Sequence, residues 1–236
     1  MPNFRAQRIA GRIVKTSLVL FVAFINIIIL WRVFFSANTP KSINSLIPNE
    51  TLSEAYGAQG DGTRFLYQDQ LSLTYSKDAR GYFGVPDYVY IPEANQMQIV
   101  FRYNNSTLRH LKEDFGLAEV PAKENELFDV TLLHVTDLTP DVTTDNEDSS
   151  TVTEVRIHPT SVKRDTTLLY TYYRFVFDGV TINEQDASSI FLDVYYLDAL
   201  DYDAKAYGTL RLYDHLSEWL PYELSNADKK ALVGTP

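Results

Sequence analysis

One stretch near the start of the chain constrains its fold more than any other. Residues 13–35 read IVKTSLVLFVAFINIIILWRVFF and contain no acidic side chain. A helix of this length measures about 35 Å at ~1.5 Å per residue, which is enough to cross the hydrocarbon core of a bilayer with some tilt. The stretch therefore predicts a single-pass transmembrane helix surrounded by the lipid bilayer.

The side chains along this stretch fit a membrane span. Its uncharged part is flanked by Lys15 and Arg32, whose long side chains can reach back to the lipid headgroups. Trp31 suits the membrane–water interface. The polar side chain in the middle is Asn26, which hydrogen bonds either to a partner helix or to its own backbone.

The charges before the span predict its orientation. Four cations and no acidic residue precede its uncharged part, and the cations are Arg5, Arg8, Arg12 and Lys15. By the positive-inside bias, residues 1–12 form a cytoplasmic basic segment and the C-terminal body lies outside the cytoplasm. Cleavage as a signal peptide at Ser36 or Ala37 would place a phenylalanine two residues before the cut, where a small residue is needed. We therefore expect an uncleaved signal-anchor.

Charge and cysteine content bound the function of the body. The first 35 residues hold five of the 21 cations and none of the 31 acidic residues, so the rest of the chain carries a net charge of −15. Such a surface repels nucleic acid and excludes nucleic-acid binding as the function. The chain has no cysteine, which excludes a thiol nucleophile and favours a bacterial cell surface over a disulfide-rich eukaryotic ectodomain.

The remainder of the chain divides into a linker and one domain. Residues 36–51 are polar and include Pro40 and Pro48, which predicts a stalk. Residues 52–236 contain short runs of alternating apolar and polar side chains and form the extracytoplasmic domain. The runs cover residues 64–75, 87–91, 97–103, 127–135, 152–157, 168–177, 190–197 and 207–213. They predict an antiparallel β-sandwich, Ig-like or jelly-roll-like, with a closed barrel as the alternative.

A helical period replaces this alternation in one place. Leu108, Leu111 and Phe115 fall on successive turns, so we expect one short helix over residues 106–116. Ser106 is suited to cap its start and Gly116 to end it. Short helical turns are also expected over residues 215–231, where Ser225 can cap the last helix.

Aromatic side chains supply the candidate ligand-binding surface. The chain has 16 tyrosines, and strand alternation places Tyr170, Tyr172 and Tyr195 on the face opposite the core residues. An exposed aromatic stripe suits the binding of a sugar or a peptide. The alternative is that both faces of these strands are covered, since strands favour aromatic residues in any case.

Two acidic groups are candidates for a calcium site, because calcium is bound by several oxygens from a loop. One group comprises Asp198, Asp201 and Asp203. The other comprises Asp141, Asp145, Glu147 and Asp148. The alternative for both groups is a solvated acidic loop.

No catalytic constellation is present, and the Gly-x-Ser-x-Gly nucleophile elbow is absent. We therefore expect a membrane-anchored, non-enzymatic binding or accessory protein. Its partner would be a protein or glycan at the cell surface or in a membrane assembly. The alternative is a carboxylate-dependent cell-wall or polysaccharide hydrolase that uses residues such as Asp193 and Asp201.

Overall fold

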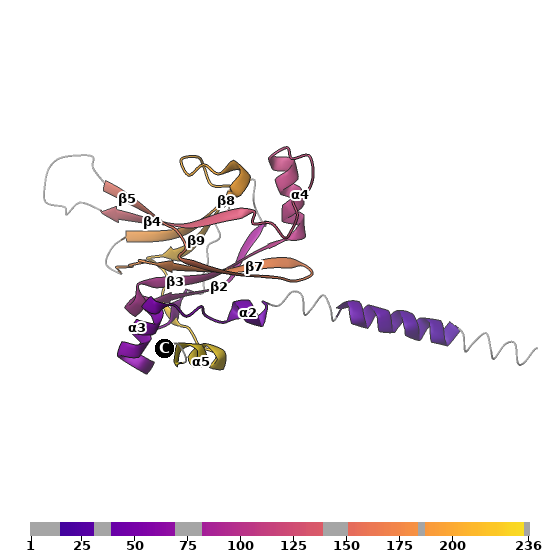
Figure 1. Ribbon diagram of the computed structural model, residues 1–236, viewed down its shortest axis with the longest axis horizontal. Helices are drawn as coiled ribbons and strands as arrows, with labels where there is room; N and C mark the ends of the chain where they lie inside the picture. Colours follow the sequence, from indigo (N-terminus) through magenta and orange to yellow (C-terminus); the bar gives the residue numbers. More distant parts are fainter. Residues whose placement is uncertain (1–14, 31–38, 69–81, 139–150, 184–186, 234–236) are drawn as a thin grey trace, which may run out of the picture.

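Two antiparallel sheets and a few helices make up the body of the protein (Figure 1). A computed structural model describes residues 15–30, 39–68, 82–138, 151–183 and 187–233. The mainly β prediction is therefore confirmed. Three short 3₁₀ helices, at Gly60–Gly62, Pro92–Ala94 and Leu197–Ala199, connect larger elements.

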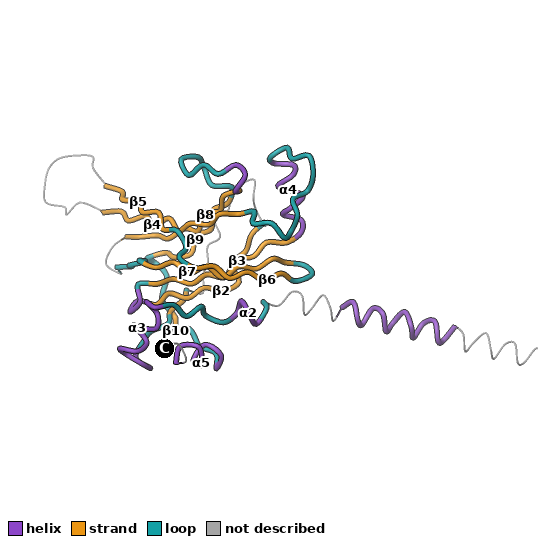
Figure 2. The backbone as a smooth tube through the Cα atoms, in the orientation of Figure 1, coloured by secondary structure: helices purple, strands orange, loops and turns teal. Residues whose placement is uncertain are grey.

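The larger sheet has six strands in the order β10-β1-β2-β3-β7-β6 (Figure 2). Its strands are β1 (Leu66–Tyr67), β2 (Phe83–Ile91), β3 (Gln96–Asn104), β6 (Ser161–Thr166), β7 (Tyr170–Asp178) and β10 (Leu220–Pro221). The pairing of β2 with β3 shifts register between Gly84 and Asp87. Pro86 lies within this shift and has no backbone N–H to donate, so an irregularity here is expected.

The smaller sheet has four strands in the order β5-β4-β8-β9. Its strands are β4 (Phe128–Leu138), β5 (Thr151–Ile157), β8 (Ala187–Tyr196) and β9 (Gly208–Asp214). The two sheets face each other and share one large core, consistent with the predicted sandwich. The ring of Phe83 on β2 meets that of Phe128 on β4 edge-to-face, at 5.1 Å between centres.

The alternation along β8 is as predicted. Leu192 and Val194 are fully buried in the core between the sheets. Asp193 and Tyr195 point to the opposite face of the same sheet, because successive side chains of a strand alternate.

The outer face of the six-stranded sheet is covered by helices α2 (Lys41–Asn44), α3 (Glu50–Gln59) and α5 (Asn226–Val233) (Figure 1). Residues 39–51 of the predicted stalk lie against this outer face, whereas residues 36–38 lie outside the described residues. Ile43 is fully buried against Val100 and Tyr172, and Leu46 is buried in a second small core with Leu52. Burial of these apolar side chains fixes a segment whose composition is otherwise that of a linker.

The helix expected over residues 106–116 is α4 (Asn105–Asp114). The predicted cap was wrong by two residues. Asn104 caps this helix, since its side-chain oxygen accepts hydrogen bonds from the backbone N–H groups of Ser106 and Thr107. Gly116 ends the helical segment as expected, with a φ of 62° that a glycine adopts without strain.

Near the N-terminus, residues 15–30 are helical and every one of them is exposed. In the described part of the chain, no helix is both long and apolar enough to qualify as a membrane span. Several residues of the predicted anchor lie outside the described residues: 13, 14 and 33–35, the flanking Trp31 and Arg32, and the cations Arg5, Arg8 and Arg12. The amide of Asn26 donates to the carbonyl of Val22 at 2.9 Å, so it bonds to its own backbone.

The shared core generates a stability prediction. Leu192→Ala removes a fully buried side chain and leaves a cavity, so we expect a loss of ~2–5 kcal/mol in the free energy of unfolding. Leu216→Ala is the matched control, because this side chain is 83% exposed, and its effect should stay within about 0.5 kcal/mol. Denaturant unfolding of the two variants measures the difference, and equal effects would contradict the assigned core.

Candidate functional site

The three predicted ligand-binding tyrosines do not form one surface. Tyr170 and Tyr172 lie on β7 in the six-stranded sheet, whereas Tyr195 lies on β8 in the four-stranded sheet. Tyr172 is fully buried beneath Ile43 of α2. Tyr170 is half-buried, with the guanidinium of Arg102 at 4.6 Å from the centre of its ring. The structure therefore places the tyrosines on two different outer faces.

Tyr195 belongs to a polar network on the outer face of the four-stranded sheet. The guanidinium of Arg156 donates to the hydroxyl of Tyr195 at 2.6 Å and contacts Asp193 at 3.4 Å. Asp193 is 5% exposed and its other oxygen accepts from the hydroxyl of Thr209 at 2.8 Å. Asp201, the second carboxylate of the hydrolase alternative, accepts from the backbone N–H of Asp203 at 2.9 Å. These contacts hold the carboxylates in structural hydrogen bonds.

The candidate calcium ligands do not converge. Asp198 accepts from the hydroxyl of Tyr196 at 2.8 Å, and Asp201 is occupied by the turn that it forms with Asp203. Among the described residues, no group of three acidic or histidine side chains is close enough to hold a metal ion. The other acidic group, Asp141, Asp145, Glu147 and Asp148, lies outside the described residues.

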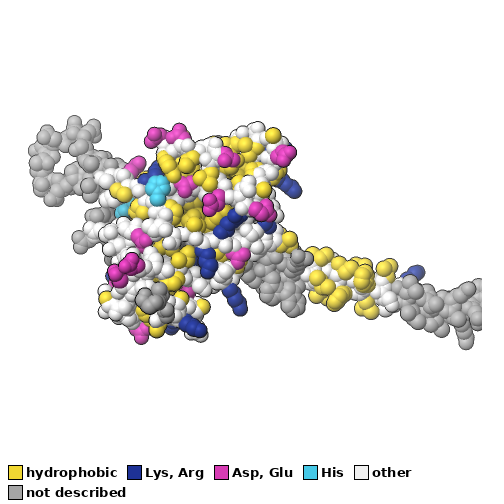
Figure 3. Space-filling model, viewed as in Figure 1, with side chains coloured by type: hydrophobic (Ala, Val, Ile, Leu, Met, Phe, Trp, Pro, Cys, Tyr) yellow, Lys and Arg dark blue, Asp and Glu magenta, His cyan; other side chains and the backbone are white. Residues whose placement is uncertain are grey.

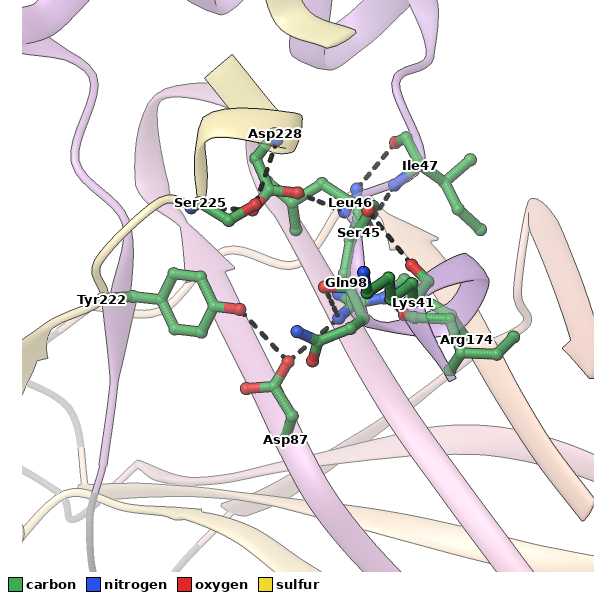
Figure 4. Close-up of polar contacts among 12 residues, drawn as sticks. Lys41, Ser45, Leu46, Ile47, Asp87, Gln98, Arg174, Tyr222, Ser225 and Asp228 are labelled. Atoms are coloured by element: carbon green, nitrogen blue, oxygen red, sulfur yellow. Dashed lines mark hydrogen bonds and ion pairs between the residues drawn. The ribbon is translucent and has the colours of Figure 1, made fainter. Parts of the chain in front are cut away.

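An extensive polar site that the sequence analysis did not predict lies on the outer face of the six-stranded sheet. In it, side chains of the folded body bind the backbone of residues 43–47, the segment that precedes α3 (Figure 4). We call this arrangement the clasp and define it by Arg174, Gln98 and Asp228 together with residues 43–47. It contains one basic, one neutral and one acidic side chain, each of which is buried.

Arg174 is the centre of the clasp. Its side chain is fully buried on the outer face of β7. Nε donates to the carbonyl of Ile43 at 2.6 Å, and Nη2 donates to the carbonyl of Asn44 at 3.2 Å. The same Nη2 pairs with Asp87 on β2 at 2.9 Å. Strand register explains the pair, because Asp87, Val100 and Arg174 are aligned across β2, β3 and β7. Arg174 therefore reaches over Val100 to its counter-ion.

Gln98 binds both polar groups of one residue. Its Oε1 accepts from the backbone N–H of Ile47 at 2.9 Å, and its Nε2 donates to the carbonyl of Ile47 at 2.8 Å. The side-chain amide thus satisfies the backbone N–H and C=O of Ile47, as a neighbouring strand would. A fully buried glutamine costs free energy unless it is hydrogen-bonded, so these contacts also stabilise Gln98 itself.

Asp228 connects the clasp to the C-terminal helix. Its carboxylate is 1% exposed and accepts from the backbone N–H of Leu46 at 2.7 Å. It also accepts from the backbone N–H and the hydroxyl of Ser225. In return, the hydroxyl of Ser225 accepts from the backbone N–H of Asp228, so Ser225 caps α5 as predicted. Segments near the two ends of the chain are thereby joined over the same sheet.

A cavity of about 500 Å³ lies beside the clasp. Its wall is formed by Tyr67, Gln68, Pro86, Asp87, Tyr88, Pro221, Tyr222 and Glu223. Asp87 connects the cavity to the clasp, because its Oδ2 accepts from Arg174 and, at 3.2 Å, from the hydroxyl of Tyr222. Burial, together with the Asp87 carboxylate, raises the pKa of Tyr222 to about 12, so this phenol remains a neutral donor at physiological pH.

Comparison of the chain with models of protein families, with curated proteins and with solved structures found no match.

The sequence did contain a signal for the clasp. Gln96 and Gln98 alternate with Met97 and Ile99 on β3, so two amide side chains point to the face opposite the core. Arg174 interrupts the aromatic run of β7 on that same face. Such polar residues on an otherwise apolar strand indicate a covered face with polar partners, but they do not say which segment covers it.

If the clasp holds residues 41–47 on the body, loss of its hydrogen bonds should make the backbone amides of this segment exchange faster with solvent. Gln98→Met removes both hydrogen bonds to Ile47 and should weaken the docking of residues 41–47 by ~1–3 kcal/mol, at ~0.5–1.5 kcal/mol per bond. Hydrogen–deuterium exchange should then show faster uptake in this segment. Thr131→Val, which alters a fully buried polar residue in the other sheet, is the matched control and should leave the segment unchanged. Unaltered uptake in Gln98→Met would show that the segment is not held by these contacts.

Proposed function

We propose that this is a single-pass, membrane-anchored binding or accessory protein without enzymatic activity. Residues 13–35 form an uncleaved signal-anchor, residues 1–12 are cytoplasmic, and the β-rich body lies on the extracytoplasmic side of a bacterial cell membrane. The body engages a protein or glycan partner, and the contacts of the clasp favour a partner within a membrane assembly.

The exposed apolar helix supports the anchor. All residues from 15 to 30 are exposed, and apolar side chains make up much of the face of this helix that is seen in Figure 3. The exposed large side chains are Leu18, Val19, Leu20, Phe21, Val22, Phe24, Ile25, Ile27, Ile28, Ile29 and Leu30, between 39% and 68% exposed. Soluble proteins rarely leave so much contiguous apolar surface in water. Transfer of this surface from water into the hydrocarbon core of a bilayer is favourable in free energy.

The clasp is the observation that favours a partner close to the membrane. Under this proposal the span ends at residue 35 and the docked segment begins at Lys41, so residues 36–40 form the whole connection. An extended chain of this length reaches at most about 20 Å. The body is thus held close to the bilayer, where a partner must also be membrane-proximal. A long flexible stalk would suit a distant surface ligand instead.

The polar contacts of the candidate carboxylates favour binding over hydrolysis. Asp193 is held by Arg156 and Thr209, and Asp201 by the backbone of its own loop. The hydrolase alternative requires a carboxylate that is free to exchange a proton with a substrate. A binding role makes no such demand.

Single-cysteine labelling tests the topology in a chain that has no native cysteine. Lys205→Cys places a thiol on an exposed loop of the body and should react with a membrane-impermeant maleimide on intact cells. Asn3→Cys is the matched control and should react only after lysis. The full chain should also stay in the membrane pellet after carbonate extraction. Labelling of the two positions in the reverse order would contradict the proposed orientation, and release by carbonate would contradict the anchor.

A further inference from the structure

We propose that the cavity beside the clasp binds the cationic side chain of a partner protein, an arginine or a lysine. This inference deepens the proposed binding function by naming the chemistry of the partner, and it rests on that function. Three features of the cavity favour such a ligand: its tyrosine side chains, the fixed carboxylate inside it and the charge around it.

Three of the eight residues that line the cavity are tyrosines, namely Tyr67, Tyr88 and Tyr222. Tyr67 and Tyr222 are arranged edge-to-face, with ring centres 6.4 Å apart. Tyr88 is 3% exposed, and its hydroxyl accepts from the backbone N–H of Gln68 at 2.7 Å. The volume of about 500 Å³ is that of a small-ligand site and accommodates one long side chain with the backbone that carries it. Aromatic faces attract cations through the ring quadrupole, and arginine stacks on them especially well.

The carboxylate of Asp87 is held in place before any ligand arrives. Its Oδ2 accepts both of the hydrogen bonds that Asp87 makes within the described part of the chain, one from Arg174 and one from Tyr222 (Figure 4). Oδ1 remains available as an acceptor, and the side chain is 23% exposed. Because Arg174 is fully buried behind it, Asp87 loses little conformational freedom when it accepts a further hydrogen bond. A charge-assisted bond from an ammonium or guanidinium group fits this acceptor.

The charge around the cavity selects a cation over a neutral ligand. Glu223 is exposed at the cavity, and none of the described residues that line it is basic. Arg174 balances the charge of Asp87, so among the described lining residues Glu223 leaves a net negative charge. The chain beyond residue 35 carries a net charge of −15, which attracts basic partners and raises their rate of encounter. A neutral sugar would use the tyrosine rings but would gain nothing from this field.

Capped tripeptides with a variable central residue test the inference on the full chain in nanodiscs. Isothermal titration should show that the arginine and lysine peptides bind at least tenfold more tightly than a citrulline peptide. Citrulline keeps the shape of arginine and lacks its charge. The Kd of the arginine peptide should also rise with salt concentration, as expected for a charged contact. Chitotriose serves as the uncharged saccharide probe and should not compete with the arginine peptide.

Charge reversal at the cavity separates binding from folding. Glu223→Lys changes an exposed side chain and should weaken the arginine peptide at least tenfold, whereas Glu119→Lys, on an exposed residue after α4, should leave its Kd unchanged. Asp87→Asn should abolish binding, but it also alters the clasp. If the Asp87 variant fails to fold, the comparison of Glu223→Lys with Glu119→Lys still tests the inference.

Four results would overturn the inference: equal binding of the arginine and citrulline peptides, equal effects of Glu223→Lys and Glu119→Lys, competition by chitotriose, or no binding of either cationic peptide. Each leaves the topology test untouched, so this inference falls alone if thiol labelling and carbonate extraction still give the expected results. Failure of those two experiments would remove the anchor while the binding data remain valid.

Discussion

The buried guanidinium of Arg174 is the interaction on which the arrangement of this protein depends. An arginine taken fully out of water costs free energy unless its charge is paired and its N–H groups are hydrogen-bonded. Here the counter-ion comes from Asp87 on another strand, and two acceptors come from the backbone of Ile43 and Asn44, whereas Nη1 has no hydrogen-bond partner among the described residues. The segment after the N-terminal helix is therefore part of the folding of the sheet. Without this segment, the guanidinium of Arg174 on the outer face of β7 would be exposed to solvent or buried without its two backbone acceptors.

Asp87 links this structural role to the cavity. The same oxygen that accepts from Arg174 also accepts from Tyr222, whose ring lines the cavity. A cation that binds to Asp87 from the cavity side would act on the carboxylate that fixes the clasp. The docking of residues 43–47 and the occupancy of the cavity thus depend on one side chain. Under the proposed function, this shared side chain would couple the binding of a partner to the position of the segment that follows the anchor.

The sequence predicted those elements whose signal is local. Leu192 and Asp193 alternate because β8 has one face in the core, and Leu108 and Leu111 recur because α4 packs one face on the body. β6 was missed, since Ser161–Thr166 is an edge strand of mostly polar residues without such a pattern. The docking of residues 41–47 was missed for a different reason. It depends on Gln98, Arg174 and Asp228, which are far away in sequence, and no local pattern pairs them with a particular segment.

A distance measurement between Lys41 and Glu113 tests the clasp most directly. Because the chain has no cysteine, spin labels at Lys41→Cys and Glu113→Cys, both exposed positions, are the only two in the molecule. Double electron–electron resonance on the full chain in nanodiscs should give one narrow distance distribution, since the clasp fixes residue 41 on the body that carries α4. A broad distribution, as expected for a flexible stalk, would contradict the account.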